Sequence, residues 1–263
     1  MDIQQGIKGK VFSDVLNLLF PNRCHFCGAS LSSGACVCAS CSESIEIIEG
    51  ASCTRCGAPL PSDAKPAGNG CRQCTELTFL FGRNVSLGVF DGFLRRLIHL
   101  YKFEGRRSLY HLFAAALFTH RREYIEAADF LIPVPLSAVR YSERGFNQSY
   151  MLAKEVARLA RVRFIGSVIN RIGHAAPQSS VSSQKERVSN LSDRFSVRAR
   201  FEGSLKNKRV LLVDDVLTTG VTASACAEAL MEAGVFSVDV LTLARSLKSA
   251  APLYLSSNRP IMK

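Results

Sequence analysis

The sequence contains no tryptophan among its 263 residues, and it contains no long hydrophobic run. Its longest apolar stretches, such as 113–118 and 210–213, fall far short of the roughly 20 residues that a membrane-spanning helix needs. The segment 1–5 lacks the basic region and the apolar region with which a secretory signal peptide begins. We therefore expect a soluble, cytoplasmic protein that does not insert into membranes.

Two common nucleotide-binding motifs are also absent from the sequence. No glycine-rich loop leads into the Gly-Lys-Ser/Thr of a Walker A motif, and no Gly-x-Gly-x-x-Gly signature of a dinucleotide-binding fold occurs. Hydrophobic residues make up 47% of the chain and charged residues 21%, with 18 glycines and 9 prolines. This is the composition of an ordinary globular protein, and it excludes a disordered, collagen-like or coiled-coil chain.

Cysteine and positive charge are both unevenly distributed along the chain. Nine of the ten cysteines lie in the first 80 residues. Residues 1–80 carry 6 Lys and Arg against 7 Asp and Glu, a net charge of −1, whereas residues 81–263 carry 27 against 15, a net charge of +12. We therefore predict an N-terminal cysteine-rich domain over 1–81 and a basic domain over 82–263. The basic domain indicates an anionic partner, either a nucleic acid or a phosphorylated small molecule, and charge kept for solubility is the simpler alternative.

Eight of the cysteines form four Cys-x-x-Cys pairs, which is the spacing of structural zinc sites. A two-residue spacer lets both sulfurs reach one tetrahedral ion, and two pairs complete the four ligands. Pairing in sequence order gives two sites, with spacers of 10 and 14 residues between their pairs, and the sequence leaves a crossed pairing open. The predicted zinc ligands are Cys24, Cys27, Cys38, Cys41, Cys53, Cys56, Cys71 and Cys74.

Two other interpretations of these cysteines fit less well. Disulfide bonds need an oxidising compartment, and a thioredoxin-like redox motif occurs singly beside a βαβ unit. Because cysteine fills every ligand position, no position is open for a catalytic water, and we expect structural zinc in a segment with few large apolar residues. Cys36 is left over and is expected to be a small buried residue. Residues 11–21, with apolar positions at helical spacing before Pro21, predict a packing helix.

Helix and strand patterns alternate along the basic domain. Helices are predicted at 92–100, 109–128, 147–161 and 222–233. Strands are predicted at 85–90, 129–135, 162–169, 206–213 and 238–244. Such alternation favours an α/β fold with a parallel sheet, in which ligands bind at the carboxyl ends of the strands. Arg121 and Arg122 are expected on a solvated helix face or in contact with a phosphate backbone, and Cys226 is expected in the core.

One segment, 209–222, combines a strongly apolar strand with acidic residues and a polar loop. Four aliphatic residues are followed by Asp214 and Asp215, and then by Thr-Thr-Gly-Val-Thr at the start of an alanine-rich helix. Backbone N–H groups and threonine hydroxyls at a helix N-terminus hold a phosphate dianion, and Gly220 lets the backbone approach it closely. The two carboxylates can accept hydrogen bonds from ribose hydroxyls and help to hold Mg²⁺. The pattern therefore indicates a site for a phosphorylated ribose.

This segment resembles the phosphoribosyl-pyrophosphate (PRPP) signature of type I phosphoribosyltransferases, in which an acidic pair precedes Thr-Thr-Gly-x-Thr. The order of the whole chain is an apolar helix, Cys-x-x-Cys repeats and a transferase domain. That order is similar to the ComF family, which includes the competence protein ComFC and GntX-like proteins. The resemblance covers residues 11 to about 245, and further motifs that carry it lie at 101–105, 133–135, 144–148 and, after Gln178, 185–190.

The resemblance implies a type I phosphoribosyltransferase fold behind a double zinc ribbon, and it implies roles for particular residues. The acidic pair would bind the ribose hydroxyls and organise Mg²⁺, the threonine loop would hold the 5-phosphate, and arginines after Pro135 would meet pyrophosphate. The serine-rich stretch 179–189 would close over PRPP and bring cations to the leaving group. The implied catalytic residues are Asp214, Asp215, Lys185 and Arg187. The implied PRPP-binding residues are Val213, Val216, Leu217, Thr218, Thr219, Gly220, Val221, Thr222, Arg140, Arg144 and Lys102.

The resemblance also implies a role in natural competence. We therefore expect Mg²⁺-dependent transfer of phosphoribose from PRPP to an unidentified acceptor, with single-stranded DNA and proteins of the DNA-uptake machinery as partners. Two alternatives stay open: a non-catalytic protein that binds PRPP or single-stranded DNA, and a transferase of nucleobase salvage. Residues 84–130 are expected to serve as the hood, the part of a type I transferase that recognises the acceptor. No base-stacking platform is evident, because the spacing of the aromatic residues predicts core positions for Phe90, Phe93, Tyr101 and Phe103.

Overall fold

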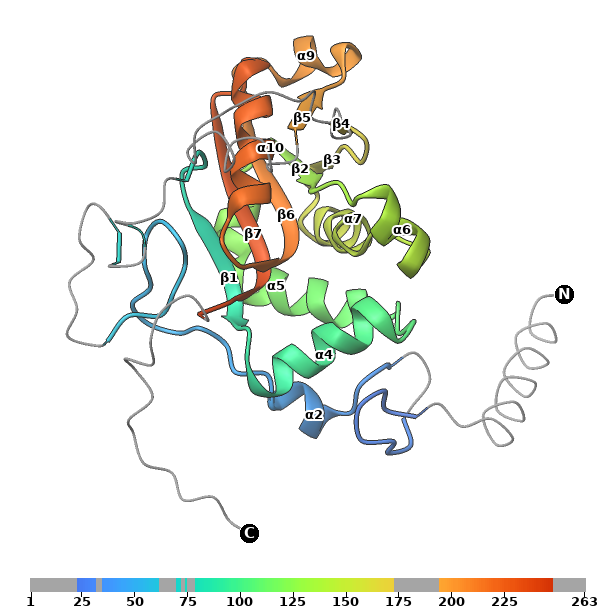
Figure 1. The fold of residues 1–263 in the computed structure, drawn as a ribbon. Coiled ribbons are helices and arrows are strands. Elements are labelled where there is room, and N and C mark those ends of the chain that lie inside the picture. Colours follow the sequence, from blue (N-terminus) through green and yellow to red (C-terminus); the bar gives the residue numbers. More distant parts are fainter. Residues whose placement is uncertain are drawn as a thin grey trace, which may run out of the picture.

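The centre of the fold is a parallel sheet of five strands, which the computed structural model arranges in the order β1-β7-β6-β2-β3 (Figure 1). The structure describes residues 23–31, 35–61, 70–71, 74, 79–172 and 194–247. The strands are β1 (Asn84–Val89), β2 (Phe130–Pro133), β3 (Arg163–Phe164), β6 (Arg209–Leu217) and β7 (Ser237–Arg245). All pairings between neighbouring strands are parallel, so the predicted parallel α/β sheet is confirmed.

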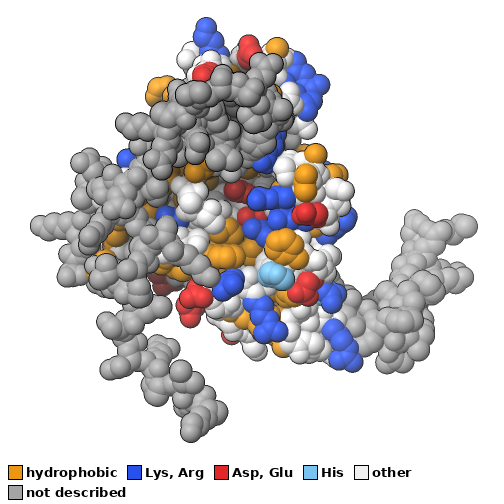
Figure 2. Space-filling view, viewed as in Figure 1, with side chains coloured by type: hydrophobic (Ala, Val, Ile, Leu, Met, Phe, Trp, Pro, Cys, Tyr) orange, Lys and Arg blue, Asp and Glu red, His pale blue; other side chains and the backbone are white. Residues whose placement is uncertain are grey.

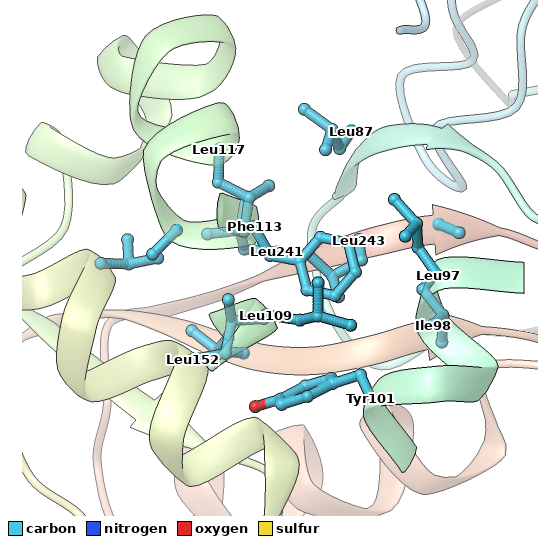
Figure 3. Packing of buried hydrophobic residues seen from close by; sticks show 14 of the residues in the cluster. Leu87, Leu97, Ile98, Tyr101, Leu109, Phe113, Leu117, Leu152, Leu241 and Leu243 are labelled. Carbon is cyan, nitrogen blue, oxygen red and sulfur yellow. The ribbon is translucent and has the colours of Figure 1, made fainter. Parts of the chain in front are cut away.

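Helices pack against both faces of this sheet. The helices of one face are α4 (Gly92–Phe103), α5 (Leu109–Glu126) and α7 (Gln148–Ala160), and the helix of the other face is α10 (Val221–Glu232). Side chains alternate along β6, so that Leu211 and Val213 pack in the core of α4, α5 and α7, whereas Leu212 packs in the core of α10. Figure 3 shows the first of these cores, where Leu241 of β7 lies close to Phe113 of α5. Among the described helices, none combines the length and the apolar character that a membrane span requires.

The chain forms a second, smaller sheet outside the central one. Its two antiparallel strands are β4 (Ile169–Ile172) and β5 (Arg194–Val197). The prediction of one strand over 162–169 is therefore wrong. The chain turns at Gly166 and Ser167, and this turn separates β3 from β4. The remaining short helices are α2 (Ala39–Glu43), α6 (Ala138–Arg144) and α9 (Ala199–Leu205). The predicted helix at 11–21 lies outside the described residues.

Residues 84–130 do not form a separate hood. β1 pairs with β7 at the edge of the central sheet, and the apolar sides of α4 and α5 pack into the core beside it. The hydrophobic residues of this segment belong to the main core, and its role in recognising the acceptor stays a prediction. Cys226 is fully buried on α10, as expected.

The expectation that Arg121 lies on a solvated helix face is also wrong. Its guanidinium donates hydrogen bonds to the carbonyl oxygens of Ser86, Ile48 and Leu87 at 2.8, 2.7 and 3.2 Å. The backbone of α5 is non-helical at this residue, with a φ of −132°. Arg121 therefore ties the cysteine-rich segment to the edge of the sheet, whereas Arg122 is exposed as expected.

Candidate functional site

A cleft of about 550 Å³ opens at the carboxyl ends of β2 and β6. The N-terminal ends of α7 and α10 and the short helix α6 border it. Figure 2 shows acidic side chains inside this hollow, with Lys and Arg side chains beside them. The lining residues are Lys102, Phe103, Val134, Pro135, Leu136, Arg140, Glu143, Arg144, Gln148, Ser149, Arg171 and the segment 214–223.

Two adjacent carboxylates of β6 lie at the bottom of the cleft. Oδ1 of Asp214 accepts hydrogen bonds from Oγ of Ser149 at 2.9 Å and from the backbone N–H of Asp215 at 2.8 Å. The buried Asp215 accepts from Nε2 of Gln148 at 2.7 Å, and its other oxygen lies 2.6 Å from Nζ of Lys102. Burial and the neighbouring charge of Asp215 raise the pKa of Asp214 to about 7. The pair therefore favours a ligand that brings a cation or several hydroxyl groups.

The first turn of α7 positions the groups that face these carboxylates. Asn147 caps the helix, and its side-chain oxygen accepts hydrogen bonds from the N–H groups of Ser149 and Tyr150 at 2.9 and 3.2 Å. The amide nitrogen of Asn147 donates to the carbonyl oxygen of Val134 at 3.2 Å, which ties the helix to the loop after β2. Oε1 of Gln148 is buried and has no hydrogen-bond partner among the described residues, so it is available to a ligand donor.

A loop at 218–222, which we call the threonine loop, connects β6 to α10. Thr218 and Thr219 are exposed, and Gly220 is the N-cap residue of α10 with a φ of +77°. A β-carbon at Gly220 would lie 2.5 Å from the ring of Phe79, so glycine is required here for space as well as for conformation. The first N–H groups of α10 have no acceptor within the helix, and together with the threonine hydroxyls they can bind a phosphate group.

Three of the predicted cationic residues line the cleft: Lys102, Arg140 and Arg144. The two arginines lie on α6, a helix that the sequence analysis did not predict. Cζ of Arg144 lies 4.7 Å from the ring centre of Phe103. Arg171 of β4 also lines the cleft, and the sequence analysis did not single it out. Positive charge therefore surrounds the acidic centre, an arrangement that suits a ligand with both phosphate groups and hydroxyls.

Four further predicted residues line the cleft, namely Val216, Leu217, Val221 and Thr222. Val213 is fully buried in the core and is not among the lining residues. Its side chain packs in the core of α4, α5 and α7, and β6 does not end there, as the sequence predicts, but continues through the acidic pair to Leu217. The predicted residues Lys185 and Arg187 lie outside the described part of the chain.

The interpretation of Phe103 as a core residue is wrong. Phe103 is the last residue of α4, it is 56% exposed, and its ring centre lies 4.9 Å from that of His99. The other three aromatic residues of the same prediction do pack in the core: Phe90, Phe93 and Tyr101. An exposed aromatic ring therefore lies at the edge of the cleft.

The eight predicted zinc ligands form two clusters. The first zinc site consists of Cys24, Cys27, Cys38 and Cys41, and the second zinc site consists of Cys53, Cys56, Cys71 and Cys74. Within each site all four sulfur atoms lie within 4.8 Å of one another. The pairs therefore combine in sequence order and not crosswise.

The geometry of both clusters fits zinc. The sulfur atoms of Cys53 and Cys74 are 3.6 Å apart, and those of Cys56 and Cys71 are 3.7 Å apart. Zn–S bonds of about 2.3 Å in a tetrahedron separate the sulfurs by about 3.8 Å. Hydrogen bonds, first from the Cys56 thiol and then from backbone N–H groups, lower the pKa of Cys53 to about 4, against the effect of burial. The prediction of two structural four-cysteine zinc sites is supported, and Cys36 lies outside both clusters.

Known proteins are similar to this chain along most of its length. A family model described as a double zinc ribbon domain matches residues 15–75, and a phosphoribosyl transferase domain model matches residues 147–255. Competence protein F of Haemophilus influenzae is 32% identical over 202 residues, which cover 74% of this chain and 84% of that protein. The DNA utilization protein YhgH of Escherichia coli is 29% identical over 236 residues, 88% of this chain and 100% of that protein. Competence protein ComFC of Bacillus subtilis is 28% identical over 221 residues, 80% of this chain and 84% of that protein.

Proposed function

The chain belongs to the ComF family of competence proteins, and from this premise we propose that it binds PRPP with Mg²⁺ and acts as a phosphoribosyltransferase in DNA uptake. The phosphoribosyl transferase domain supports the first part of the proposal, and the competence and DNA-utilization names of the relatives support the second. One observation carries it most directly. An acidic pair, a Thr-Thr-Gly-Val-Thr loop and several cationic side chains line a single cleft.

In the proposed complex, each part of the cleft binds one part of PRPP. The threonine loop holds the 5-phosphate at the N-terminus of α10. Asp214 and Asp215 accept hydrogen bonds from the ribose hydroxyls, and Arg140 and Arg144 bind the pyrophosphate group. Mg²⁺, when bound with the substrate, neutralises part of the charge of the pyrophosphate. Lys102 supplies a counter-charge to Asp215 at 2.6 Å before the substrate arrives.

The proposed reaction is a substitution at the anomeric carbon of PRPP. The bond from this carbon to the pyrophosphate oxygen breaks, the electron pair leaves with pyrophosphate, and the ribose gains oxocarbenium character. A nucleophilic group of the acceptor then forms the new bond to the same carbon and loses its proton. The fixed carboxylates favour the positive charge that develops on the ribose, and Arg140 and Arg144 favour the negative charge that grows on the leaving group.

Calorimetric titration of the full chain with PRPP and Mg²⁺ tests the binding step. We expect a micromolar Kd, which corresponds to about −8 kcal/mol. Release of pyrophosphate is then measured with single-stranded DNA and with free nucleobases as acceptors. A protein that does not bind PRPP contradicts the proposal, and one that binds it but releases no pyrophosphate with any acceptor contradicts the transferase reaction.

The affinity for PRPP and Mg²⁺ is expected to rise with pH up to about 7 and to level off above it, because the pKa of Asp214 is raised to about 7. The ligand binds the ionised carboxylate, so each pH unit below this value lowers the affinity by up to about tenfold. Titrations at several pH values with the wild type and with Asp214→Asn measure the effect. The phosphates of PRPP titrate equally in both experiments, so an equally steep pH dependence in the variant contradicts this assignment.

The same raised pKa has an opposite consequence for the stability of the ligand-free protein. Between the unfolded pKa of about 4 and the native pKa of about 7, the native state binds the proton more tightly than the unfolded state does. The contribution of Asp214 to the free energy of unfolding therefore falls as the pH rises through this range. Binding and stability thus change in opposite directions with pH at this one residue.

Single-stranded DNA is the proposed macromolecular partner, together with proteins of the uptake machinery. Phe103 offers an exposed ring at the edge of the cleft, and Arg144 lies against it. Arg106 and Arg107 follow it in the chain and are also exposed. Aromatic rings that stack on bases, placed among cations that bind the backbone, are typical of surfaces that bind single strands.

We expect Phe103→Ala to weaken binding of a single-stranded oligonucleotide by roughly 5- to 150-fold, which corresponds to about 1–3 kcal/mol for one stacked base. Phe236→Ala is the matched control. Phe236 is 68% exposed, but it lies directly before the amino end of β7, whereas the cleft lies at the carboxyl ends of the strands. Fluorescence anisotropy at one fixed salt concentration measures both variants. An equal loss of affinity in the two variants would show that Phe103 does not stack on a base.

A further inference from the structure

The two zinc sites contribute buried cysteines to different hydrophobic cores, one on each side of the central sheet. Buried cysteines of the first zinc site belong to the core of α4, α5 and α7. Buried cysteines of the second zinc site belong to the other core, together with buried residues of α10. The threonine loop leads directly into α10, so it is connected to the core of the second zinc site.

A short bridge of residues joins the second zinc site to the threonine loop and α10. Phe79 lies so close to Gly220 that a β-carbon there would be 2.5 Å from its ring. Arg55 lies in the turn from Cys53 to Cys56, which we call the knuckle of the second zinc site. Its side chain donates to the carbonyl oxygen of Phe79 at 3.2 Å and lies 5.8 Å from the ring centre of Phe79. The N–H of Leu80 donates to Oγ of Ser224, in the first turn of α10, at 3.4 Å. The knuckle thus fixes the residues that contact the loop.

Arg245 holds the loop from its other end. Its side chain is fully buried at the carboxyl end of β7. Nη1 donates to the carbonyl oxygens of Leu217, Thr218 and Ser246 at 3.0, 2.5 and 2.6 Å. Two of these acceptors are the last residue of β6 and the first residue of the threonine loop, so the position of the guanidinium fixes how the chain enters the loop.

Hydrogen bonds link the second zinc site to the strand that carries this buried guanidinium. Nδ2 of Asn84 donates to the carbonyl oxygen of Cys56 at 3.1 Å, and Oγ1 of Thr242 donates to Oδ1 of Asn84 at 3.3 Å, which links the knuckle to β7. The backbone of Cys56 is thereby joined, through Asn84 and Thr242, to the strand that ends at Arg245.

We propose that Arg245 is a positioning residue that couples the second zinc site to the threonine loop. Zinc in this site keeps Arg245 and Phe79 in place, and these residues keep the loop in the shape that binds a phosphate group. Loss of zinc from the second site weakens phosphate-ester binding, whereas loss of zinc from the first site does not. Because coupling between two sites is reciprocal, bound PRPP also tightens zinc binding at the second site by the same factor. The ligand part of this inference rests on the proposed PRPP site, and the order of the loop does not.

Hydrogen exchange of the full chain tests the coupling without any ligand. Cys71→Ser removes a ligand of the second zinc site, and Cys27→Ser removes one of the first. Zinc analysis establishes that each variant has lost one ion. We expect the amides of 217–224 to exchange at least about tenfold faster in Cys71→Ser than in the wild type, and at nearly the wild-type rate in Cys27→Ser. Equal exchange in the two variants, whether slow or fast, overturns the proposal.

Titration with PRPP and Mg²⁺ then separates this inference from the proposed function. A wild type that does not bind PRPP contradicts the proposed function, while the hydrogen-exchange contrast still decides the coupling. If PRPP binds, we expect Arg245→Met to raise its Kd about tenfold or more with zinc content unchanged, and Arg245→Lys to recover part of the affinity, because lysine also donates to carbonyl oxygens. An unchanged Kd for PRPP in a folded Arg245→Met protein overturns the positioning role. If that variant does not fold, the Kd of Arg245→Lys is compared with that of the wild type, and an unchanged value again overturns the role.

Discussion

Asp214→Asn is expected to weaken binding of PRPP and Mg²⁺ strongly, but measurably, while leaving the fold at least as stable as the wild type. Burial and the charge of Asp215 raise the pKa of Asp214 to about 7, so the ionised pair is costly without a ligand. An asparagine keeps the oxygen that accepts from Ser149 and from the Asp215 N–H at 2.9 and 2.8 Å, and it removes the repulsion. The loss of affinity is expected to exceed about 100-fold, since hydrogen bonds to a charged group contribute up to about 3 kcal/mol each.

Asp214→Asn is a cleaner substitution than Asp215→Asn. Asp215 lies 2.6 Å from the largely buried Lys102, and its neutralisation would leave that cation without its partner carboxylate. Asp239→Asn is the matched control, because Asp239 lies on the neighbouring strand β7 and pairs with Arg83 outside the cleft. Calorimetry measures binding, and thermal denaturation measures stability. Wild-type affinity in Asp214→Asn contradicts the proposed PRPP site, and a loss of both affinity and stability indicates a structural role for this carboxylate.

The unit of β6, the threonine loop and α10 could be predicted from the sequence because every signal for it is local. A strongly apolar run predicts a buried strand, Gly220 supplies the positive φ at the helix start, and the acidic pair and threonines lie between them. The largest error concerned the end of the strand. Because buried aliphatic residues stop at Val213, the pattern indicates an end there, whereas backbone pairing with β7 continues to Leu217.

Helix α6 could not be predicted from hydrophobic periodicity because it has no buried residue. The remaining signals were its caps: Oγ of Ser137 accepts from the N–H of Arg140 at 3.3 Å, and Gly145 ends the helix with a φ of +71°. Such caps stabilise a helix without an apolar face, but they also occur in turns. A search for them after β2 would have placed Arg140 and Arg144 on one helix.

The partners of the acidic pair could not be predicted because they come from distant parts of the chain. Gln148 and Ser149 lie 67 and 65 positions before the carboxylates that they contact. The sheet order places β2 beside β6 and thereby brings the start of α7 to the acidic pair, and sheet order is not a local property of the sequence. The contact of Arg121 with Ile48 has the same origin, because it joins segments 73 positions apart.

Removal of zinc is expected to unfold the cysteine-rich segment and to destabilise the whole protein. Structural zinc in small domains contributes roughly 10–16 kcal/mol of apparent binding free energy, and this energy is also folding energy. The first zinc site contributes buried cysteines to one core of the sheet, and the second zinc site contributes them to the other. The loss of stability is therefore not confined to the segment that binds the ions. We expect a decrease in Tm of more than about 10 °C on treatment with a strong chelator, since a few kcal/mol already shift the Tm of a domain of this size by that amount.

Zinc analysis of single variants tests the ligand assignment separately from the loss of stability. The wild type is expected to contain one ion for each of its two clusters, and Cys41→Ser is expected to lose the ion of the first site. Cys36→Ser is the matched control, because Cys36 lies among the same ligands in sequence but directs its sulfur to the carbonyl oxygen of Ser108 at 3.7 Å. Cys226→Ser, buried on α10, controls for the loss of a core thiol. If Cys36→Ser loses an ion and Cys41→Ser does not, Cys36 is a ligand of the first zinc site and Cys41 is not, which contradicts the assignment.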